Sequence, residues 1–253
     1  MKRKITLIQI LFLCVFIGCG IYFAAYYVNK HKTEKEMEQL QDMVQDNSTD
    51  TEEIESYEPN GMLTRYYELY ERNNDMIGWL RIEGTCIDYP VMYKDDSNAY
   101  YLHRSFEGEV NSAGMPFLDY QCDPLGNSQN TIIYAHNMRN GTMFHELLNY
   151  KDKEFGESYP YINFDTLYER RQYQIFAVFS TAVGASDEFR YYEFIDAENN
   201  EEFNSYVDEC IAHSFYSTDI HPEYGDELIT LSTCSYSRNN ERFVVVGKLI
   251  AKR

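Results

Sequence analysis

The strongest constraint on the fold is a series of eight short, strand-like runs between residues 78 and 250. Each run is rich in β-branched or aromatic residues, and Gly, Asn or Asp residues that favour turns stand between the runs. The runs occupy residues 78–82, 86–92, 115–119, 130–136, 161–164, 172–183, 227–234 and 242–250. Because closing a sheet removes its exposed edges, the pattern predicts a closed or nearly closed eight-stranded β-barrel.

Several helices are expected around this barrel, so the fold class is mainly β with peripheral helices. Helical interruptions are predicted near residues 97–104, 143–150 and 197–213, and Cys210 in the last of them falls on its apolar stripe, which favours a core position. A helix before the barrel, over residues 61–72, is predicted from an aromatic stripe at i, i+3, i+4 and i+7. The stripe consists of Leu63, Tyr66, Tyr67 and Tyr70.

A long apolar run precedes the barrel. Residues 5–28 read ITLIQILFLCVFIGCGIYFAAYYV and follow the basic residues of positions 2–4. As a helix, this run extends about 36 Å, which is enough to cross a bilayer, and it is longer than the apolar core of a cleaved signal peptide. We expect a single-pass transmembrane anchor with residues 1–4 in the cytoplasm and the rest of the chain outside. An alternative is lipidation of Cys19, since Phe16-Ile17-Gly18-Cys19 is similar to a lipoprotein cleavage box.

The chain beyond the apolar run is strongly acidic. The first 33 residues contain five basic and no acidic residues, which leaves 17 basic against 41 acidic residues and a net charge of −24. Such a surface repels nucleic-acid phosphates and argues against general nucleic-acid binding. Residues 29–60 are polar and acid-rich and predict a solvated stalk, which would be helical at first, and residues 61–253 form the predicted catalytic domain.

The six cysteines do not form a metal-binding pattern. No C-x-x-C pair is present, so neither a structural zinc site nor another cofactor is predicted. Outside the apolar run, Cys86, Cys122, Cys210 and Cys234 permit three disulfide pairings, and nothing in their spacing selects one. We expect Cys234 to be free.

Three residues at the ends of strand-like runs make chemical sense together. His136 ends the run NTIIYAH, Cys234 ends ELITLSTC, and Arg242 opens RFVVVGKLI. A nearby cation favours the thiolate form of a cysteine, an imidazole can protonate an amine leaving group, and a guanidinium can donate to a developing oxyanion. Taken singly, each residue is more often structural. As a set they indicate a cysteine transacylase or protease.

The same motifs resemble the sortases, and specifically class B. TLSTC is followed eight residues later by Arg242, and IIYAHNM lies about a hundred residues upstream. The segments DMIGWLRIEGTCIDYPV, NAYYLHRSF, GMPFLDYQC and NGTMFHELLNY occur in the order of the class B pattern. The resemblance covers residues 61–251 and departs mildly from the pattern, for example at Ala135, where Gly often precedes the histidine.

The resemblance implies a membrane-anchored transpeptidase of Gram-positive bacteria that anchors surface proteins. Its partners would be a C-terminal sorting peptide of the NPxT[G/N] or LPxTG type and an amine of a cell-wall precursor. Cys234 would be the nucleophile, His136 the general acid and base, and Arg242 the donor to the oxyanion. Substrate contacts are expected from Asn98 and Leu102, spaced i, i+4 on a short helix, and from Ser232 and Tyr134, which alternate with Cys234 and His136 along their strands.

Two alternatives stay open at this level. A cysteine protease would use the same three residues but release the acyl group to water. A noncatalytic surface-binding barrel would retain the residues without turnover.

Overall fold

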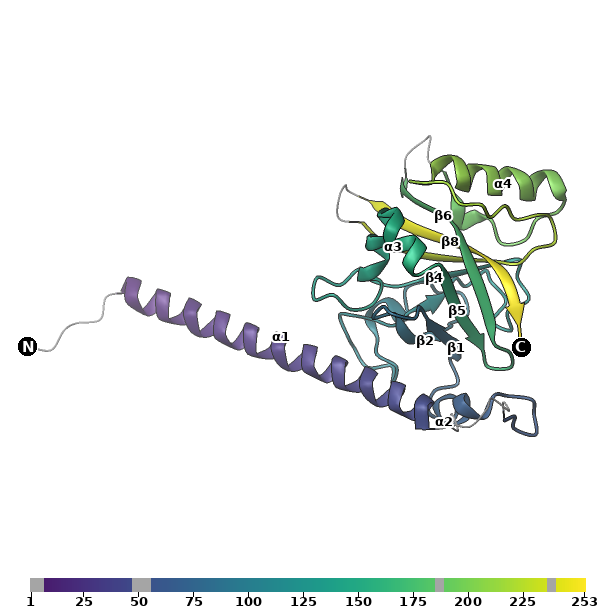
Figure 1. The fold of residues 1–253 in the computed structure, drawn as a ribbon. Coiled ribbons are helices and arrows are strands. Elements are labelled where there is room, and N and C mark those ends of the chain that lie inside the picture. The colour runs from purple at the N-terminus through teal and green to yellow at the C-terminus, as the bar shows by residue number, and fades with distance from the viewer. Residues whose placement is uncertain (1–6, 47–55, 185–188, 236–239) are drawn as a thin grey trace, which may run out of the picture. The chain divides into compact units, whose positions relative to one another are not determined.

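The computed structural model describes residues 7–46, 56–184, 189–235 and 240–253, and Figure 1 shows its elements. The chain divides into two compact units, one up to Gln39 and one from Leu40 onward. The first helix, α1, covers Leu7–Asp46. The predicted cytoplasmic residues 1–4 lie outside the described residues.

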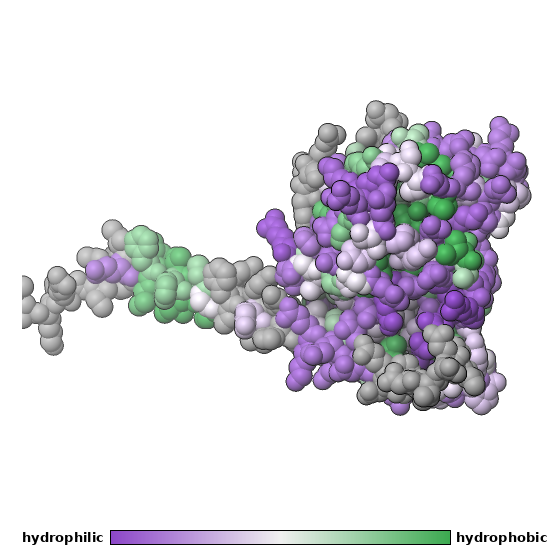
Figure 2. All heavy atoms as spheres, viewed as in Figure 1, coloured by the Kyte–Doolittle hydropathy of each residue, from purple (hydrophilic) through white to green (hydrophobic). Residues whose placement is uncertain are grey.

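The described part of the first unit is the segment of α1 up to Gln39, which includes the apolar run. Its exposed side chains include Leu11, Phe12, Phe16 and Ile21. Figure 2 shows a hydrophobic stretch in green on this helix. Within the described part of the chain, no helix has both the length and the apolarity needed to cross a membrane.

The second unit begins inside the segment for which a solvated stalk is predicted. Leu40 and Val44 are buried, and the Gln41 side chain donates a 2.8 Å hydrogen bond to the carbonyl oxygen of Asp88. The last turns of α1 therefore belong to the folded unit, because they carry apolar side chains that this unit buries. The acidic stretch around residues 47–55 lies outside the described residues.

The eight predicted strands form a closed barrel with the order β1-β2-β3-β4-β7-β8-β6-β5. The prediction of an eight-stranded barrel is thus confirmed. The strands are β1 (Met76–Arg81), β2 (Asp88–Met92), β3 (Phe117–Leu118), β4 (Asn130–Tyr134), β5 (Tyr161–Thr166), β6 (Arg171–Ala182), β7 (Leu228–Cys234) and β8 (Glu241–Lys252).

The helices agree less closely with the prediction. The helix before the barrel is α2 (Thr64–Arg72), and α4 (Asn200–His213) fits the predicted segment 197–213. Segment 97–104 holds only the 3₁₀ turn η1 (Tyr101–His103), so the predicted helical face shared by Asn98 and Leu102 does not form. Around residue 150 the 3₁₀ helix η2 (His145–Lys151) is followed by the unpredicted α3 (Lys153–Ser158), and a third 3₁₀ turn is η3 (Tyr191–Glu193).

The stripe on α2 also differs from the prediction. Tyr66 and Leu69 are buried, whereas Tyr67 is exposed. Tyr66 stacks on the Trp79 ring of β1 at a centroid distance of 6.3 Å, and its hydroxyl donates to Asp165 of β5. The helix therefore lies against β1 and β5.

The longest strands, β6 and β8, form an antiparallel ribbon. Their pairing runs from Arg171 opposite Lys252 to Ala182 opposite Glu241. At about 3.3 Å per residue, the two ends of this ribbon are more than 30 Å apart. Strand β7 pairs with the other edge of β8 along its whole length, from Leu228 to Cys234.

Helix α4 covers one face of this ribbon. Phe203, Tyr206, Val207 and Cys210 of α4 share a buried cluster with side chains of the strands, so the prediction of a core role for Cys210 is confirmed. The cluster takes Leu228 from β7 and Val244 and Val246 from β8. Burial of each large apolar side chain contributes about 1.5–3 kcal/mol, which holds the helix and the strand face together.

Candidate active site

The candidate site lies where β4 and β7 end and β8 begins. Strands β4 and β7 are parallel and pair up to Tyr134 opposite Ser232. The same register continues beyond β4, since the amide of Ala135 donates to the carbonyl oxygen of Ser232 at 3.3 Å and the Thr233 hydroxyl donates to the carbonyl oxygen of Ala135 at 2.7 Å. The next step of this register brings His136 beside Cys234.

Cys234 and Arg242 are direct cross-strand partners on β7 and β8. Alternation along β7 places Cys234 on the same face as Leu228, and alternation along β8 places Arg242 on the same face as Val244 and Val246. These apolar residues lie under α4, so the thiol and the guanidinium continue that face beyond the helix. Both are half-buried, and Cys234 is a free cysteine, as predicted.

His136 is half-buried and held from the opposite side by the loop that contains η1. Its Nε2 lies 2.9 Å from the carbonyl oxygen of Leu102, and its ring stacks on His103 with centroids 5.4 Å apart. Burial lowers the pKa of His136 below its usual value, and the positive charges of His103 and Arg242 lower this pKa further, against the effect of the Leu102 carbonyl. The imidazole is therefore mainly neutral at pH 7.

Asn137 ties the two strand ends together. Its buried side chain donates to the carbonyl oxygen of Cys234 at 3.0 Å, and its Oδ1 lies 2.7 Å from Nδ1 of His145. The amide group thus joins the segment of His136 to the last residue of β7. Such a bridge restricts how far the thiol can move relative to the imidazole.

Two of the predicted substrate contacts meet at a buried carboxylate. Asp119 accepts hydrogen bonds from the Asn98 side chain at 3.0 Å and from the Tyr134 hydroxyl at 2.9 Å. Burial raises the pKa of Tyr134, and Asp119 adds to this effect, so the phenol keeps its proton. This network sets the positions of Asn98 and Tyr134 next to the strand that leads to His136.

The other two predicted contacts differ in their access to a ligand. Leu102 is half-buried and borders the site through its carbonyl contact with His136. Ser232 is only 1% exposed, and its hydroxyl lies 2.6 Å from the hydroxyl of Tyr191. Strand alternation puts Ser232 on the face of Cys234, and the Tyr191 hydroxyl lies against it, so Ser232 is not exposed in this structure.

The adjoining strand ends of this barrel carry a free thiol, a guanidinium and a neutral imidazole. This arrangement is suited to acyl transfer through a cysteine thioester. A family model described as the sortase domain matches residues 80–250 of the chain. Sortase B of Staphylococcus aureus (strain NCTC 8325 / PS 47) is 30% identical over 99% of this chain and 98% of its own length. The chain therefore belongs to the sortase family of cysteine transpeptidases.

Further comparisons agree on class B. Sortase B of Listeria monocytogenes serovar 1/2a (strain ATCC BAA-679 / EGD-e) is 37% identical over 73% of this chain and 74% of its own length. The solved complex of Staphylococcus aureus sortase B with substrate superposes with a TM-score of 0.77 at 29% identity, covering 88% of this chain and 98% of that one. The enzyme class inferred from the three strand-end residues is confirmed, and the noncatalytic barrel is not supported.

Sequence reasoning missed three residues that contact this site. Asn137 follows His136 directly, and a polar residue just beyond a strand end is a signal that could have indicated it. His103 follows Leu102 in the 3₁₀ turn η1, and Tyr191 begins the 3₁₀ turn η3, and no periodic pattern indicates either residue. Only the folded chain places them beside His136 and Ser232.

Proposed function

We propose that the protein cleaves a C-terminal sorting peptide after threonine and transfers the acyl part to an amine of a cell-wall precursor. Cys234 is the nucleophile, His136 the general acid and base, and Arg242 the oxyanion donor. The observation that supports this proposal is the pairing of Cys234 with Arg242, together with the hydrogen bond by which Asn137, the residue after His136, holds the carbonyl oxygen of Cys234.

The first half-reaction forms a thioester. The Cys234 thiolate attacks the threonine carbonyl carbon, and the negative charge that develops on the oxygen is stabilised by the guanidinium of Arg242. Protonated His136 donates its proton to the departing amine as the peptide bond breaks. Because the pKa of His136 is lowered, the imidazolium that this step requires is a minor form of the ring at neutral pH.

The second half-reaction consumes the thioester. An incoming amine attacks the same carbonyl carbon, Arg242 again faces the oxyanion, and neutral His136 takes the proton from the attacking nitrogen. The thiolate of Cys234 then leaves, and a new amide bond has replaced the one that was broken. Water in place of the amine would give hydrolysis by the same groups.

The peptide groove is proposed to run past Asn98, Leu102 and Tyr134. The Asp119 network holds Asn98 and Tyr134, and Leu102 stands against the imidazole, so a bound peptide would lie alongside all three. The motif preferred by this groove is expected to be of the NPxT[G/N] or LPxTG type.

A peptide panel tests the function. The full-length chain is incubated with LPxTG, NPxTG and NPxTN peptides, with and without an amine acceptor, and the products are identified by mass. We expect cleavage after threonine and an acceptor-dependent ligation product for at least one motif, with none for Cys234→Ala. Hydrolysed peptide as the sole product at saturating acceptor would identify a protease instead.

We also propose that residues 5–28 anchor the enzyme in the cell membrane, with the N-terminus cytoplasmic and the catalytic domain outside. The length of the apolar run and the exposed side chains on the described part of α1 support this. Fractionation of cells and external protease digestion test both location and orientation. Retention of a Cys19→Ser variant in the membrane supports the uncleaved helix, whereas its release would indicate lipidation.

A further inference from the structure

A cavity rich in arginine lies at the end of the barrel opposite Cys234. It has a volume of about 210 Å³, far above the ~15 Å³ that one water molecule requires. Five arginines line it, although the whole chain contains only 22 basic residues and has a net charge of −19. They are Arg65, Arg81, Arg170, Arg171 and Arg253.

The strand register builds one wall of this cavity. Arg81 of β1 pairs with Asn163 of β5, Asn163 pairs with Gln172 of β6, and Gln172 pairs with Ala251 of β8. Directly paired residues point to the same side of a sheet, so these four side chains form a single row across four strands. The Gln172 amide donates to Asn163 Oδ1 at 3.1 Å, which keeps the centre of the row polar.

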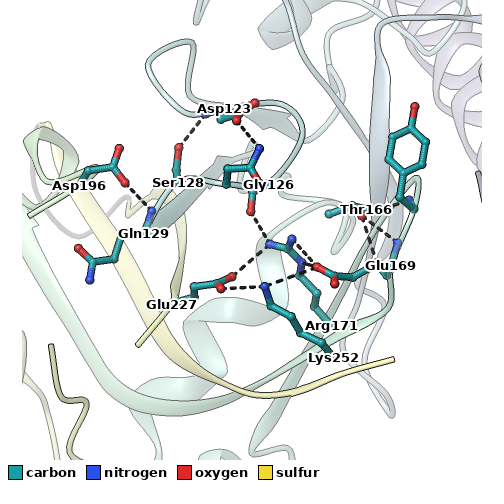
Figure 3. Close-up of polar contacts among 12 residues, drawn as sticks. Asp123, Gly126, Ser128, Gln129, Thr166, Glu169, Arg171, Asp196, Glu227 and Lys252 are labelled. Carbon is teal, nitrogen blue, oxygen red and sulfur yellow. Dashed lines mark hydrogen bonds and ion pairs between the residues drawn. The ribbon is translucent and has the colours of Figure 1, made fainter. Parts of the chain in front are cut away.

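Arg171 is a buried residue of the cavity wall and is held there by an ion network. Its guanidinium is 6% exposed and contacts Glu169 at 2.5 Å, the carbonyl oxygen of Gly126 at 2.7 Å and Glu227 at 3.4 Å. Figure 3 shows this guanidinium between the two carboxylates, with Lys252 reaching both of them. The charge of Arg171 is therefore largely balanced within the fold.

The carboxylate partner of Arg81 engages only part of its guanidinium. Arg81 donates through Nε to Asp88 at 3.0 Å, while its two terminal nitrogens make no hydrogen bond to any described residue. Arg170 lies 3.8 Å from Asp165, which also accepts a hydrogen bond from the Tyr66 hydroxyl. Against the five arginines, Glu83 and Asp165 are the acidic residues of the lining. The open part of the cavity thus presents guanidinium groups to solvent.

We propose that this cavity binds a phosphate-bearing ligand. Guanidinium groups donate in pairs to phosphate oxygens, and the concave wall removes part of the competing water, which strengthens each contact. The cavity is large enough for more than one phosphate group, so a pyrophosphate group fits the lining better than a single small ion. The phosphate belongs either to a soluble molecule or to the headgroup of an anionic lipid.

The chain carries its own reporter for this test. Trp79 is the single tryptophan of the sequence, lines the cavity and donates to the same Asp88 carboxylate as Arg81. We expect a saturable change in its emission when the full-length chain in neutral detergent is titrated with pyrophosphate, and a weaker one with inorganic phosphate. Calorimetry of the same titrations gives an affinity that does not depend on the fluorophore.

A second arm distinguishes the two sources of phosphate. The full-length chain is reconstituted into vesicles of phosphatidylcholine alone or with phosphatidylglycerol, and Trp79 emission is compared. A shift that requires the anionic lipid assigns the site to a headgroup, and saturation by pyrophosphate without a lipid effect assigns it to a soluble ligand. Absence of both responses overturns the proposal.

Substitutions localise the response. We expect Arg81→Gln and Arg253→Gln each to weaken binding about tenfold, since each removes one charge-assisted contact. Arg72→Gln, which removes the same charge from an exposed position outside the cavity, should bind like the parent. Unchanged affinity in both cavity variants overturns the proposal. Acylation of Cys234 at the parental rate shows that the variants are folded.

Discussion

The two ends of the β6–β8 ribbon use arginine in different ways. At one end, Arg242 lies opposite a thiol and forms no ion pair with a described residue, and burial lowers the pKa of the nearby imidazole, which favours its neutral form. At the other end, Arg171 is enclosed by carboxylates, and Arg81 and Arg253 border an open cavity. In the roles proposed above, the same side chain serves a reacting centre at one end and a ligand-binding surface at the other, where Arg171 also belongs to an ion network.

The difference lies in what surrounds each guanidinium. A guanidinium without a carboxylate partner can stabilise a negative charge that develops on the substrate during a reaction. A buried guanidinium between two carboxylates is already neutralised by them, and its removal lowers the stability of the fold. The following predictions separate these roles, from the largest expected effect to the smallest.

Replacing the nucleophile should have the largest effect. Cys234→Ala is expected to abolish the thioester, because no other described residue at the site offers a thiol. Intact-protein mass after incubation with a sorting peptide measures this. Cys86→Ala is the matched control, since burial raises the pKa of Cys86 to about 12 and keeps that thiol protonated. An acyl adduct on the Cys234→Ala protein would refute the assignment.

The oxyanion donor comes next. Arg242→Lys should lower kcat/KM about 100-fold, because an ammonium retains the charge but cannot reproduce the planar fork of donors. Arg81→Lys, at the far end of the barrel, should leave kcat/KM near the parental value. Steady-state kinetics with a fluorogenic peptide measure both. Equal values for Arg242→Lys and the parent would exclude a role for the fork.

The structural arginine should affect stability instead of catalysis. Arg171→Met leaves the Gly126 carbonyl without its donor and sets Glu169 and Glu227 near each other. Because these carboxylates are about one third exposed, solvent screening limits the loss in free energy of unfolding to about 2 kcal/mol. Denaturant titration measures it, with Lys252→Met as the exposed control expected to lose less than about 1 kcal/mol. Equal losses would argue against a buried network.

The smallest effect is expected from the ring stacked on the imidazole. His103→Gln removes a positive charge that lowers the pKa of His136, so this pKa should rise and the acid limb of kcat/KM should move to higher pH. NMR titration of the His136 ring protons measures the direction. At neutral pH, kcat/KM should change less than about threefold, because charges at an exposed ring are screened. His213→Gln is the control and should leave the titration of His136 unchanged.

The barrel and the three residues at strand ends could be predicted from the sequence, because local patterns indicate them. Strand runs and their turns are encoded by neighbouring residues, and family motifs fix His136, Cys234 and Arg242 to the ends of such runs. The helix predicted at 97–104 failed because the chain there bonds to the barrel: Asn98 donates to Asp119, and the Leu102 carbonyl contacts His136. Tertiary contacts of this kind override local propensity.

By itself, the sequence determined the strand series, the acidic charge and the apolar N-terminal run, and it predicted the three groups that are proposed to react. Only the tertiary structure decided that Tyr191 covers Ser232, that Asn137 bridges to Cys234, and that five arginines scattered from α2 to the end of β8 line one cavity. The physical reason is that strand order and register bring together residues far apart in the chain. No local sequence pattern predicts which distant residues are paired in this way.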